Sequence, residues 1–380
     1  MVIAIALLVI VVGSVLFHLL TPWWSTPLAS GWAEMDSTLH ITLVVTGVFF
    51  VVINLFVVYT LWRFRHRQGS RAAYQPEHRK LERGLIVLTT IGIVALLAPG
   101  LKVYARYVQP PEDAMLLEVL GLQWQWHYRF AGADGKLGAT DTRFVSAQNP
   151  YGLDPADASG RDDVLVLDSE VHLPMGKPIK VLLRSHDVLH DYFVPQFRAR
   201  MNIVPGQVSW FWFTPTKAGR YEAMCAQLCG MGHPNMRGFV VVEDEAAFNA
   251  WLARQATHAT SMAAPTAAAA APAAAGDAVA QGRSLAQAKG CVACHTVDGS
   301  AGVGPTWKGL YGTLETMTDG STAKVDDEYI RAFIRDPKAR AVRGFAQVMP
   351  QIAMNDGELD ALLAYIKSHG ADPASAPVQR

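Results

Sequence analysis

The 380-residue sequence contains few cysteines and has no excess of charge of either sign. It has 33 Lys and Arg residues against 33 Asp and Glu residues, so its formal net charge is zero. A chain without a strong overall field is not expected to bind nucleic acid through its net charge. The 4 cysteines stand in two close pairs, Cys225 with Cys229 and Cys291 with Cys294. Both pairs lie in motifs typical of metal binding or cofactor attachment, which leaves no cysteine for a structural disulfide.

Apolar residues, in contrast, are abundant: they make up 51% of the sequence and are concentrated before residue 108. Three apolar stretches, at about residues 1–20, 39–62 and 84–107, are each close to the ~20 residues that a helix needs to cross a bilayer. The first stretch is either a retained helix or a cleaved signal peptide, and the lack of a basic region and of a clear cleavage site favours retention. Residues 1–107 are therefore expected to form a membrane region with two or three transmembrane helices.

The loop between the second and third apolar stretches is rich in basic residues. By the positive-inside rule such a loop lies on the cytoplasmic side of the membrane. Everything after residue 108 then faces the opposite side, which predicts a multi-pass protein of the bacterial inner membrane with its soluble domains in the periplasm. The basic residues of the loop are Arg63, Arg65, Arg67, Arg71, Arg79, Lys80 and Arg83.

A short stretch between residues 225 and 236 concentrates metal-binding side chains. Cys225, Cys229 and His233 recur at intervals of four, and Met236 follows. Two glycines and a proline within the stretch argue against a continuous helix and favour a loop folded around a metal. Two thiolates, an imidazole and a thioether suit copper, and two thiolates can bridge two copper ions. A structural zinc site and a merely buried cysteine pair are the alternatives, although zinc rarely uses Met.

The region of residues 108–254 has the pattern of an all-β domain. Short apolar runs are separated by clusters of Gly, Pro, Asn and Asp, which predicts an antiparallel β-sandwich or barrel. The metal loop then joins two late strands, at residues 220–224 and 237–242, and residues 247–255 are expected to form a short closing helix. The apolar runs are residues 115–121, 164–167, 179–183, 208–214 and 239–242.

A second soluble domain is predicted after residues 255–276, an Ala- and Pro-rich linker that favours a semi-flexible tether over a helix. In residues 277–380, Cys291, Cys294 and His295 form the c-type haem attachment motif, in which both thiols bind haem covalently and the imidazole binds iron. Helical patterns at residues 282–289 and 356–369 flank this motif. The domain resembles the all-α class I cytochrome c fold. Met349, which precedes Pro350, is the predicted distal ligand, with Met317 and Met354 as competitors.

The metal loop, together with residues 123–126 (Gln-Trp-Gln-Trp) and residues 185–195, resembles subunit II of the haem-copper cytochrome c oxidases. The resemblance covers roughly the first 250 residues. It implies a cupredoxin fold for residues 108–254 and a dinuclear copper centre (CuA). His186 stands where the family usually has another residue, so it is interpreted as a polar neighbour of the site. The implied copper ligands are His190, Cys225, the backbone carbonyl of Gln227, Cys229, His233 and Met236.

The same resemblance implies roles for further residues. Trp124 matches the tryptophan through which electrons enter, and the alternative is core packing. Asp187 matches a carboxylate near the surface where the electron donor docks, and the alternative is a solvated side chain. Glu82 matches a glutamate at the entrance of a proton pathway, and the alternative is an interfacial carboxylate among basic neighbours. Gln227 replaces a glutamate that reaches magnesium at the subunit interface, so magnesium binding stays open because an amide is a poorer ligand for this cation.

The predicted helices lack the histidine array of an oxygen-reducing centre, so that centre is expected on another chain. Together with the haem c motif, the resemblance implies the electron-input subunit of a caa-type cytochrome c oxidase, a proton-translocating oxidoreductase of the respiratory chain that reduces O2 to water. Expected partners are oxidase subunits I and III, the membrane, and an external cytochrome c or another periplasmic electron donor. Two alternatives remain: the copper subunit of a nitric oxide reductase, and a non-enzymatic membrane-anchored electron carrier or copper-delivery protein.

Overall fold

The computed structural model describes residues 2–21, 26–69, 71, 74, 76–146, 149–263, 275–349, 351–352 and 354–370. Half of the predicted linker, at residues 264–274, and Pro350 of the predicted Met-Pro motif lie outside these residues. The chain divides into two compact units. The first contains Met1–Gln109 with Gln196–Arg198, and the second contains Pro110–Pro195 with Ala199–Arg380.

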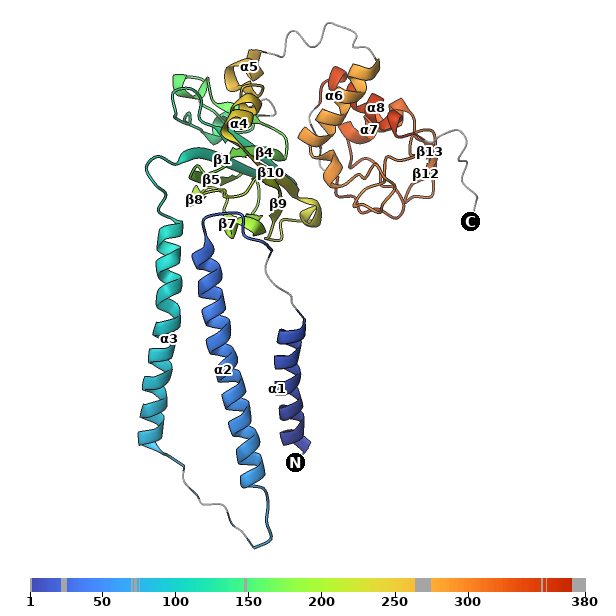
Figure 1. Ribbon diagram of the computed structural model, residues 1–380. Coiled ribbons are helices and arrows are strands. Elements are labelled where there is room, and N and C mark those ends of the chain that lie inside the picture. Colours follow the sequence, from blue (N-terminus) through green and yellow to red (C-terminus); the bar gives the residue numbers. More distant parts are fainter. Residues whose placement is uncertain are drawn as a thin grey trace. The chain divides into compact units, whose positions relative to one another are not determined.

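Three long apolar helices form most of the first unit: α1 (Val2–Leu20), α2 (Ala33–Arg63) and α3 (Arg79–Tyr107) (Figure 1). Each is long and apolar enough to cross a membrane. Large apolar side chains lie exposed along all three helices, an arrangement that lipid stabilises and water does not. Both α2 and α3 begin earlier than their apolar stretches predicted. In α2, Glu34 and Asp36 stand in the first turn, where the positive end of the helix dipole stabilises carboxylates.

Polar contacts join segments of this unit that are distant in the sequence. Arg106 near the end of α3 forms an ion pair with Glu34 at the start of α2. Arg198 donates from Nε and Nη2 to the two carboxylate oxygens of Asp36, at 2.6 and 2.9 Å. Ser30 donates from Oγ to the carbonyl of Phe197 at 2.7 Å. These contacts hold the beginning of α2 against α3 and against the turn at residues 196–198.

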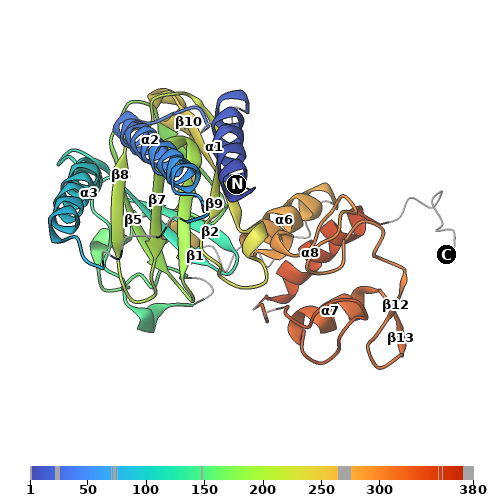
Figure 2. The ribbon, with the colours of Figure 1, turned by 90° about the horizontal axis from the view of Figure 1, so that it is seen from below.

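The second unit begins with a β-sandwich of two sheets, seen from a second direction in Figure 2. The first sheet has the order β11-β3-β2-β1-β5-β8, and the second has the order β4-β10-β9-β6-β7. The six strands of the first sheet are β11 (Ala256–Thr257), β3 (Val164–Val166), β2 (Gln125–Phe130), β1 (Met115–Leu122), β5 (Ile179–Ser185) and β8 (Ser209–Phe213). The five strands of the second are β4 (Glu170–Pro174), β10 (Arg237–Glu243), β9 (Gly219–Cys225), β6 (His190–Val194) and β7 (Ala199–Ile203).

The prediction of an antiparallel sandwich holds for most strand pairs but not for two of them. Strand β1 pairs in parallel with β5, and β10 pairs in parallel with β4, whereas the other pairs are antiparallel. Parallel neighbours need a long connection between them. Here β2, β3 and β4 intervene in the sequence between β1 and β5, and five strands intervene between β4 and β10. The sandwich is therefore a mixed one, and its parallel pairs join segments far apart in the chain.

Aromatic side chains fill the sandwich and close one end of it. Trp126 of β2 meets Tyr192 of β6 edge-on, with ring centroids 5.0 Å apart, and so links the two sheets. Phe130 of β2 packs against Trp251 of α4 (Glu245–Leu252) at 6.0 Å. This closing helix begins two residues before the predicted start, because Asp244 caps it by accepting a hydrogen bond from the backbone N of Ala247.

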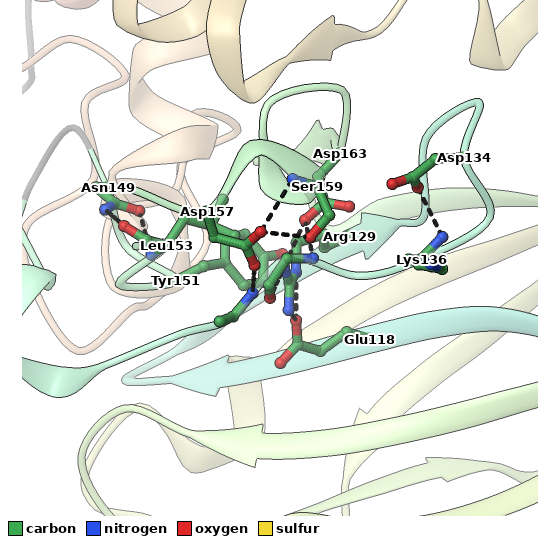
Figure 3. Close-up of polar contacts among 12 residues, drawn as sticks. Glu118, Arg129, Asp134, Lys136, Asn149, Tyr151, Leu153, Asp157, Ser159 and Asp163 are labelled. Atoms are coloured by element: carbon green, nitrogen blue, oxygen red, sulfur yellow. Dashed lines mark hydrogen bonds and ion pairs between the residues drawn. The ribbon is translucent and has the colours of Figure 1, made fainter. Parts of the chain in front are cut away.

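A buried ion-pair network ties the long connection between β2 and β3 to the first sheet (Figure 3). Arg129 of β2 pairs with Glu118 of β1 and donates from Nη1 to Asp163 at 2.6 Å and to the carbonyl of Gly138 at 3.1 Å. Arg184 of β5 adds a second cation, 3.0 Å from Glu118. Removing one member of such a buried network leaves a charge without its partner, which is costly. The network therefore fixes a loop that has few apolar residues of its own.

The C-terminal domain is mostly helical, with one short hairpin. Helix α6 packs closely against α8, since a side chain at Gly282 would collide with the backbone of Ala361. Asn355 and Glu358 form a capping box at the start of α8. The elements are α6 (Ala275–Ala288), the 3-10 turn η6 (Cys291–Ala293), β12 (Leu314–Thr316), β13 (Thr322–Lys324), α7 (Asp327–Arg335) and α8 (Asp356–Ser368), while α5 (His258–Ala263) follows the sandwich.

Candidate copper and haem sites

The structure brings the predicted copper ligands together at one end of the sandwich. His190 is the first residue of β6 and Cys225 the last of β9, and His190 Nδ1 lies 4.0 Å from Cys225 Sγ. The two cysteine sulfurs are 3.7 Å apart. Cys229 Sγ lies 3.6 Å from His233 Nδ1 and 3.8 Å from Met236 Sδ. The cluster is thus continuous from the strand that carries His190 to the end of the loop.

This donor set fits a metal centre in both spacing and chemistry. Two donor atoms that bind one metal ion at about 2.0–2.3 Å lie about 3.5 Å apart in a tetrahedral site, close to the observed separations. The carbonyl oxygen of Gln227 lies 3.1 Å from Cys225 Sγ and so joins the same cluster. Hydrogen bonds from the neighbouring Cys229 thiol and the His190 ring lower the pKa of Cys225, which favours the thiolate that binds metals. Soft sulfur donors combined with imidazole are typical of copper.

The backbone of the sandwich holds this cluster in place. The backbone N of Ala226 donates to the carbonyl of Asp191 at 3.0 Å, and the N of Cys225 donates to the carbonyl of Met236 at 3.1 Å. The first bond ties the start of the loop to β6, and the second ties it to the loop's own end. The ligands therefore project from a closed loop whose base is part of a sheet.

Asp187 lies directly behind one of the ligands. Its Oδ1 is 2.8 Å from His190 Nε2, and its Oδ2 accepts a hydrogen bond from the backbone N of Gln123 at 2.7 Å. Burial raises the pKa of Asp187, but the hydrogen bonds from His190, Gln123 and Val188 outweigh it and lower this pKa below its usual value. A carboxylate that accepts from the outer nitrogen of a metal-binding His orients the ring and fixes its tautomer. Sequence reasoning missed this contact, although the spacing of three residues is visible in the sequence.

His186 is not part of the cluster. Among the described residues, the His, Cys, Asp and Glu side chains whose donor atoms all lie within 4.8 Å of one another are those of His190, Cys225 and Cys229. His233 joins this group through its 3.6 Å contact with Cys229, whereas His186 is not in the group. The backbone N of His186 donates to the carbonyl of Gly121 at 2.9 Å, at the end of β1. This position agrees with the interpretation of His186 as a polar neighbour.

The two tryptophans of the Gln-Trp-Gln-Trp motif occupy different environments. Trp126 is completely buried between the sheets and meets His190 edge-on at 6.1 Å. Trp124 is half-buried and lies against the metal loop, where its Nε1 donates to the carbonyl of Cys229 at 3.1 Å. A side chain at Gly232 would collide with the Trp124 indole, so this glycine permits the close approach. Trp124 therefore contacts the loop from its outer side.

Glu82 lies in the first turn of α3. Its Oε1 accepts a hydrogen bond from the backbone N of His78 at 3.2 Å, and the side chain of His78 in turn accepts from the N of Leu81 at 3.1 Å. These reciprocal bonds cap the helix. The observed contact of Glu82 is thus a local one at the end of a membrane helix.

The haem attachment residues line a cavity in the C-terminal domain. Cys291, Cys294 and His295 lie on its wall. His295 Nδ1 donates to the carbonyl of Pro305 at 2.8 Å, and the ring stacks on Trp307 at a centroid distance of 5.3 Å. Burial lowers the pKa of His295, which keeps the ring neutral and leaves Nε2 able to bind iron.

The three candidate methionines do not share one position. Met349 and Met354 both line the cavity, together with apolar side chains such as Ile330 and Leu362. Met317 is only 2% exposed and pairs with Val342 in an isolated bridge, and it is not among the lining residues. An apolar cavity with two thiols, one imidazole and two thioethers on its wall fits a covalently attached haem.

Comparisons with known proteins find a match for each of the two soluble domains. The periplasmic domain of cytochrome c oxidase subunit II matches residues 115–244, and the cytochrome c family matches residues 279–370. Alternative cytochrome c oxidase subunit 2 of Bradyrhizobium diazoefficiens is 50% identical over 259 residues, which cover 68% of this chain and 94% of the relative. Cytochrome c oxidase subunit 2 of Cereibacter sphaeroides is 27% identical over 233 residues, which cover 59% of this chain and 77% of the relative. The protein of the same name from Alkalihalophilus pseudofirmus is 23% identical over 337 residues, which cover 86% of this chain and 82% of the relative. The predicted fold class is confirmed.

Proposed function

The chain belongs to the cytochrome c oxidase subunit II family, and from this premise we propose how its residues carry electrons into a haem-copper oxidase. A copper-type domain and a cytochrome c domain follow each other in one chain. The protein is accordingly the electron-input subunit of an oxidoreductase, and its fused cytochrome c domain is the donor to its copper domain. The oxygen-reducing site lies on another chain.

We propose that His190, Cys225, the carbonyl of Gln227, Cys229, His233 and Met236 hold dinuclear copper. The observation that supports this most is the continuous cluster of donor atoms, with separations of 3.6 to 4.0 Å between neighbouring side-chain donors. When bound, the copper pair supplies one-electron storage. The chain itself supplies rigidity, because ligands fixed by two strands and a closed loop move little when the charge of the centre changes.

The haem c site is proposed to use Cys291 and Cys294 for covalent attachment and His295 with Met349 as axial ligands. The support is their common position on one apolar cavity. Methionine opposite histidine raises the potential of haem iron, as suits a donor to copper. The domain boundaries, with a tether at residues 255–276, are part of the same proposal. A tether raises the effective concentration of the haem domain near the copper domain.

Trp124 is the proposed point of electron entry to the copper centre. Its indole donates to the backbone of Cys229, so the ring is hydrogen-bonded to a residue that supplies a ligand. Asp187, predicted at first as a docking residue, is better placed to orient His190 through the 2.8 Å contact with its outer nitrogen. Gln227 contributes its carbonyl, and magnesium binding by its side chain is not part of the proposal because an amide is a poor ligand for that cation.

The protein is membrane-anchored, and we propose that it crosses the bacterial inner membrane more than once, with both soluble domains in the periplasm. The basic residues between α2 and α3 support this orientation. Oxidase subunits I and III are the proposed partners of the helices, and an external cytochrome c or another periplasmic protein is the proposed donor. Glu82 is proposed as the entrance of a proton pathway on the basis of its position at the start of α3.

The test is purification of the complex from the native membrane, with metal analysis and copper electron paramagnetic resonance. We expect a large partner chain with haem a, oxygen consumption, and a mixed-valence dinuclear copper signal. His190→Ala should abolish that signal while His186→Ala retains it. A complex that reduces nitric oxide but not oxygen would replace the proposal, as would a chain that purifies alone without catalytic partners.

A further inference from the structure

A buried carboxylate next to the copper cluster has no role in the function proposed so far. Asp191 follows His190 on β6 and is only 1% exposed. Its Oδ2 accepts a hydrogen bond from Arg200 Nε at 2.8 Å. Its Oδ1 is buried and has no hydrogen-bond partner among the described residues. An ionised group in such a position is costly unless the surrounding structure gains from its charge.

The sheet places the backbone of Asp191 beside two copper ligands. Strands β6 and β9 are antiparallel, with Tyr192 opposite Cys225, so Asp191 stands beside Ala226, whose N donates to the Asp191 carbonyl at 3.0 Å. Because side chains alternate along a strand, His190 points into the site and Asp191 points to the other face of the same sheet. The carboxylate and the ligands are therefore separated by little more than one layer of backbone.

Arg200 covers the carboxylate from the outside. It lies on β7, and its side chain is 54% exposed, whereas that of Asp191 is 2% exposed. The positive charge of the pair is therefore screened by water, and the negative charge much less. The net effect at the copper cluster is that of a fixed negative charge in a region of low dielectric constant.

We propose that Asp191 is a positioning residue of the copper site whose charge lowers the reduction potential of the copper pair. A fixed negative charge stabilises the oxidised form of a metal centre, which carries one more positive charge than the reduced form. Arg200 holds the carboxylate in place, and its positive charge partly offsets the electrostatic effect of the carboxylate on the copper site. This inference rests on the proposed copper site, and it adds a residue that is not itself a copper ligand.

The test is potentiometric titration of the copper absorption in the full-length chain in detergent, with haem c in the same sample as an internal reference. Asp191→Asn keeps the shape of the side chain and removes its charge. We expect the equilibrium constant for copper reduction to increase about tenfold. For one electron this corresponds to a rise of about 59 mV in the copper midpoint potential. Arg200→Gln should shift it in the opposite direction. The haem potential should stay unchanged in both variants.

Glu170→Gln is the matched control, since it neutralises another carboxylate that pairs with an arginine of the same sheet, 2.8 Å from Arg220. It should leave the copper potential unchanged. An Asp191→Asn protein that retains copper at the wild-type potential would overturn the inference. If Asp191→Asn loses copper, the copper potential of Arg200→Gln decides. An Arg200→Gln potential that does not fall below the wild-type value also overturns the inference. A wild-type chain without a dinuclear copper signal would instead refute the proposed function.

Discussion

Replacing Asp187 with Asn should weaken copper binding rather than donor docking. The carboxylate accepts from His190 Nε2 at 2.8 Å and from the backbone N of Gln123 at 2.7 Å. An asparagine amide has one acceptor oxygen instead of two, so it cannot keep both bonds. Loss of the carboxylate behind a metal-binding His typically costs about 10- to 100-fold in metal affinity, which is about 1.4–2.8 kcal/mol. We expect a decrease in copper affinity of that size.

The assay is copper removal by a competing chelator, followed through the absorption of the copper centre. Asp157→Asn is the control, because the Asp157 carboxylate also accepts from two backbone N atoms, those of Ala139 at 2.7 Å and Ser159 at 3.0 Å, but its hydrogen bonds involve no histidine. It should leave copper affinity unchanged. The reasoning is refuted if Asp187→Asn binds copper as the wild type does and is only reduced more slowly by an external donor, since that result would assign Asp187 to docking.

Three further predictions concern the haem ligand, the electron entry and pH. Met349→Ala should keep the haem attached and remove the red absorption band of methionine-bound iron, and survival of that band would point to Met354. Trp124→Phe should fold, since swaps of similar shape cost under about 1.5 kcal/mol, but should reduce copper from haem c much more slowly; an unchanged rate would make Trp124 a packing residue. Burial and the charge of Arg129 lower the pKa of His258. The unfolded chain then binds a proton below about pH 6.5 that the folded chain does not, so the free energy of unfolding should fall as pH drops below 6.5. His258→Gln should flatten this dependence in denaturant titrations, and an unchanged slope would contradict it.

The sequence was most informative where chemistry restricts the residue type. The copper loop and the haem motif were found because few arrangements of Cys, His and Met serve any other purpose. Strands β1, β5, β8 and β10 appeared as apolar runs because they bury ordinary aliphatic and aromatic side chains. In these strands, the apolar composition is enough to predict the strand.

Strand β2 shows why not every strand appears as an apolar run. All six of its residues, Gln-Trp-His-Tyr-Arg-Phe, are buried, so the sequence has no alternation of apolar and polar positions. Arg129 is tolerated there only because Glu118 and Asp163 surround it, and these come from segments that the sequence alone does not bring together. The pairing of Asp187 with His190 was also not predicted from the sequence. It depends on the turn in which Ser185 Oγ donates to the carbonyl of Val188 at 2.5 Å.

Flash reduction of haem c in the full-length, copper-loaded chain tests the central claim most directly. The absorption of haem c and that of the copper centre are followed in the same sample at several protein concentrations. The account predicts that copper is reduced as haem c is oxidised, electron for electron, at a rate independent of protein concentration because both domains belong to one chain. Haem c that stays reduced beside oxidised copper, or a rate that rises in proportion to protein concentration, would contradict it.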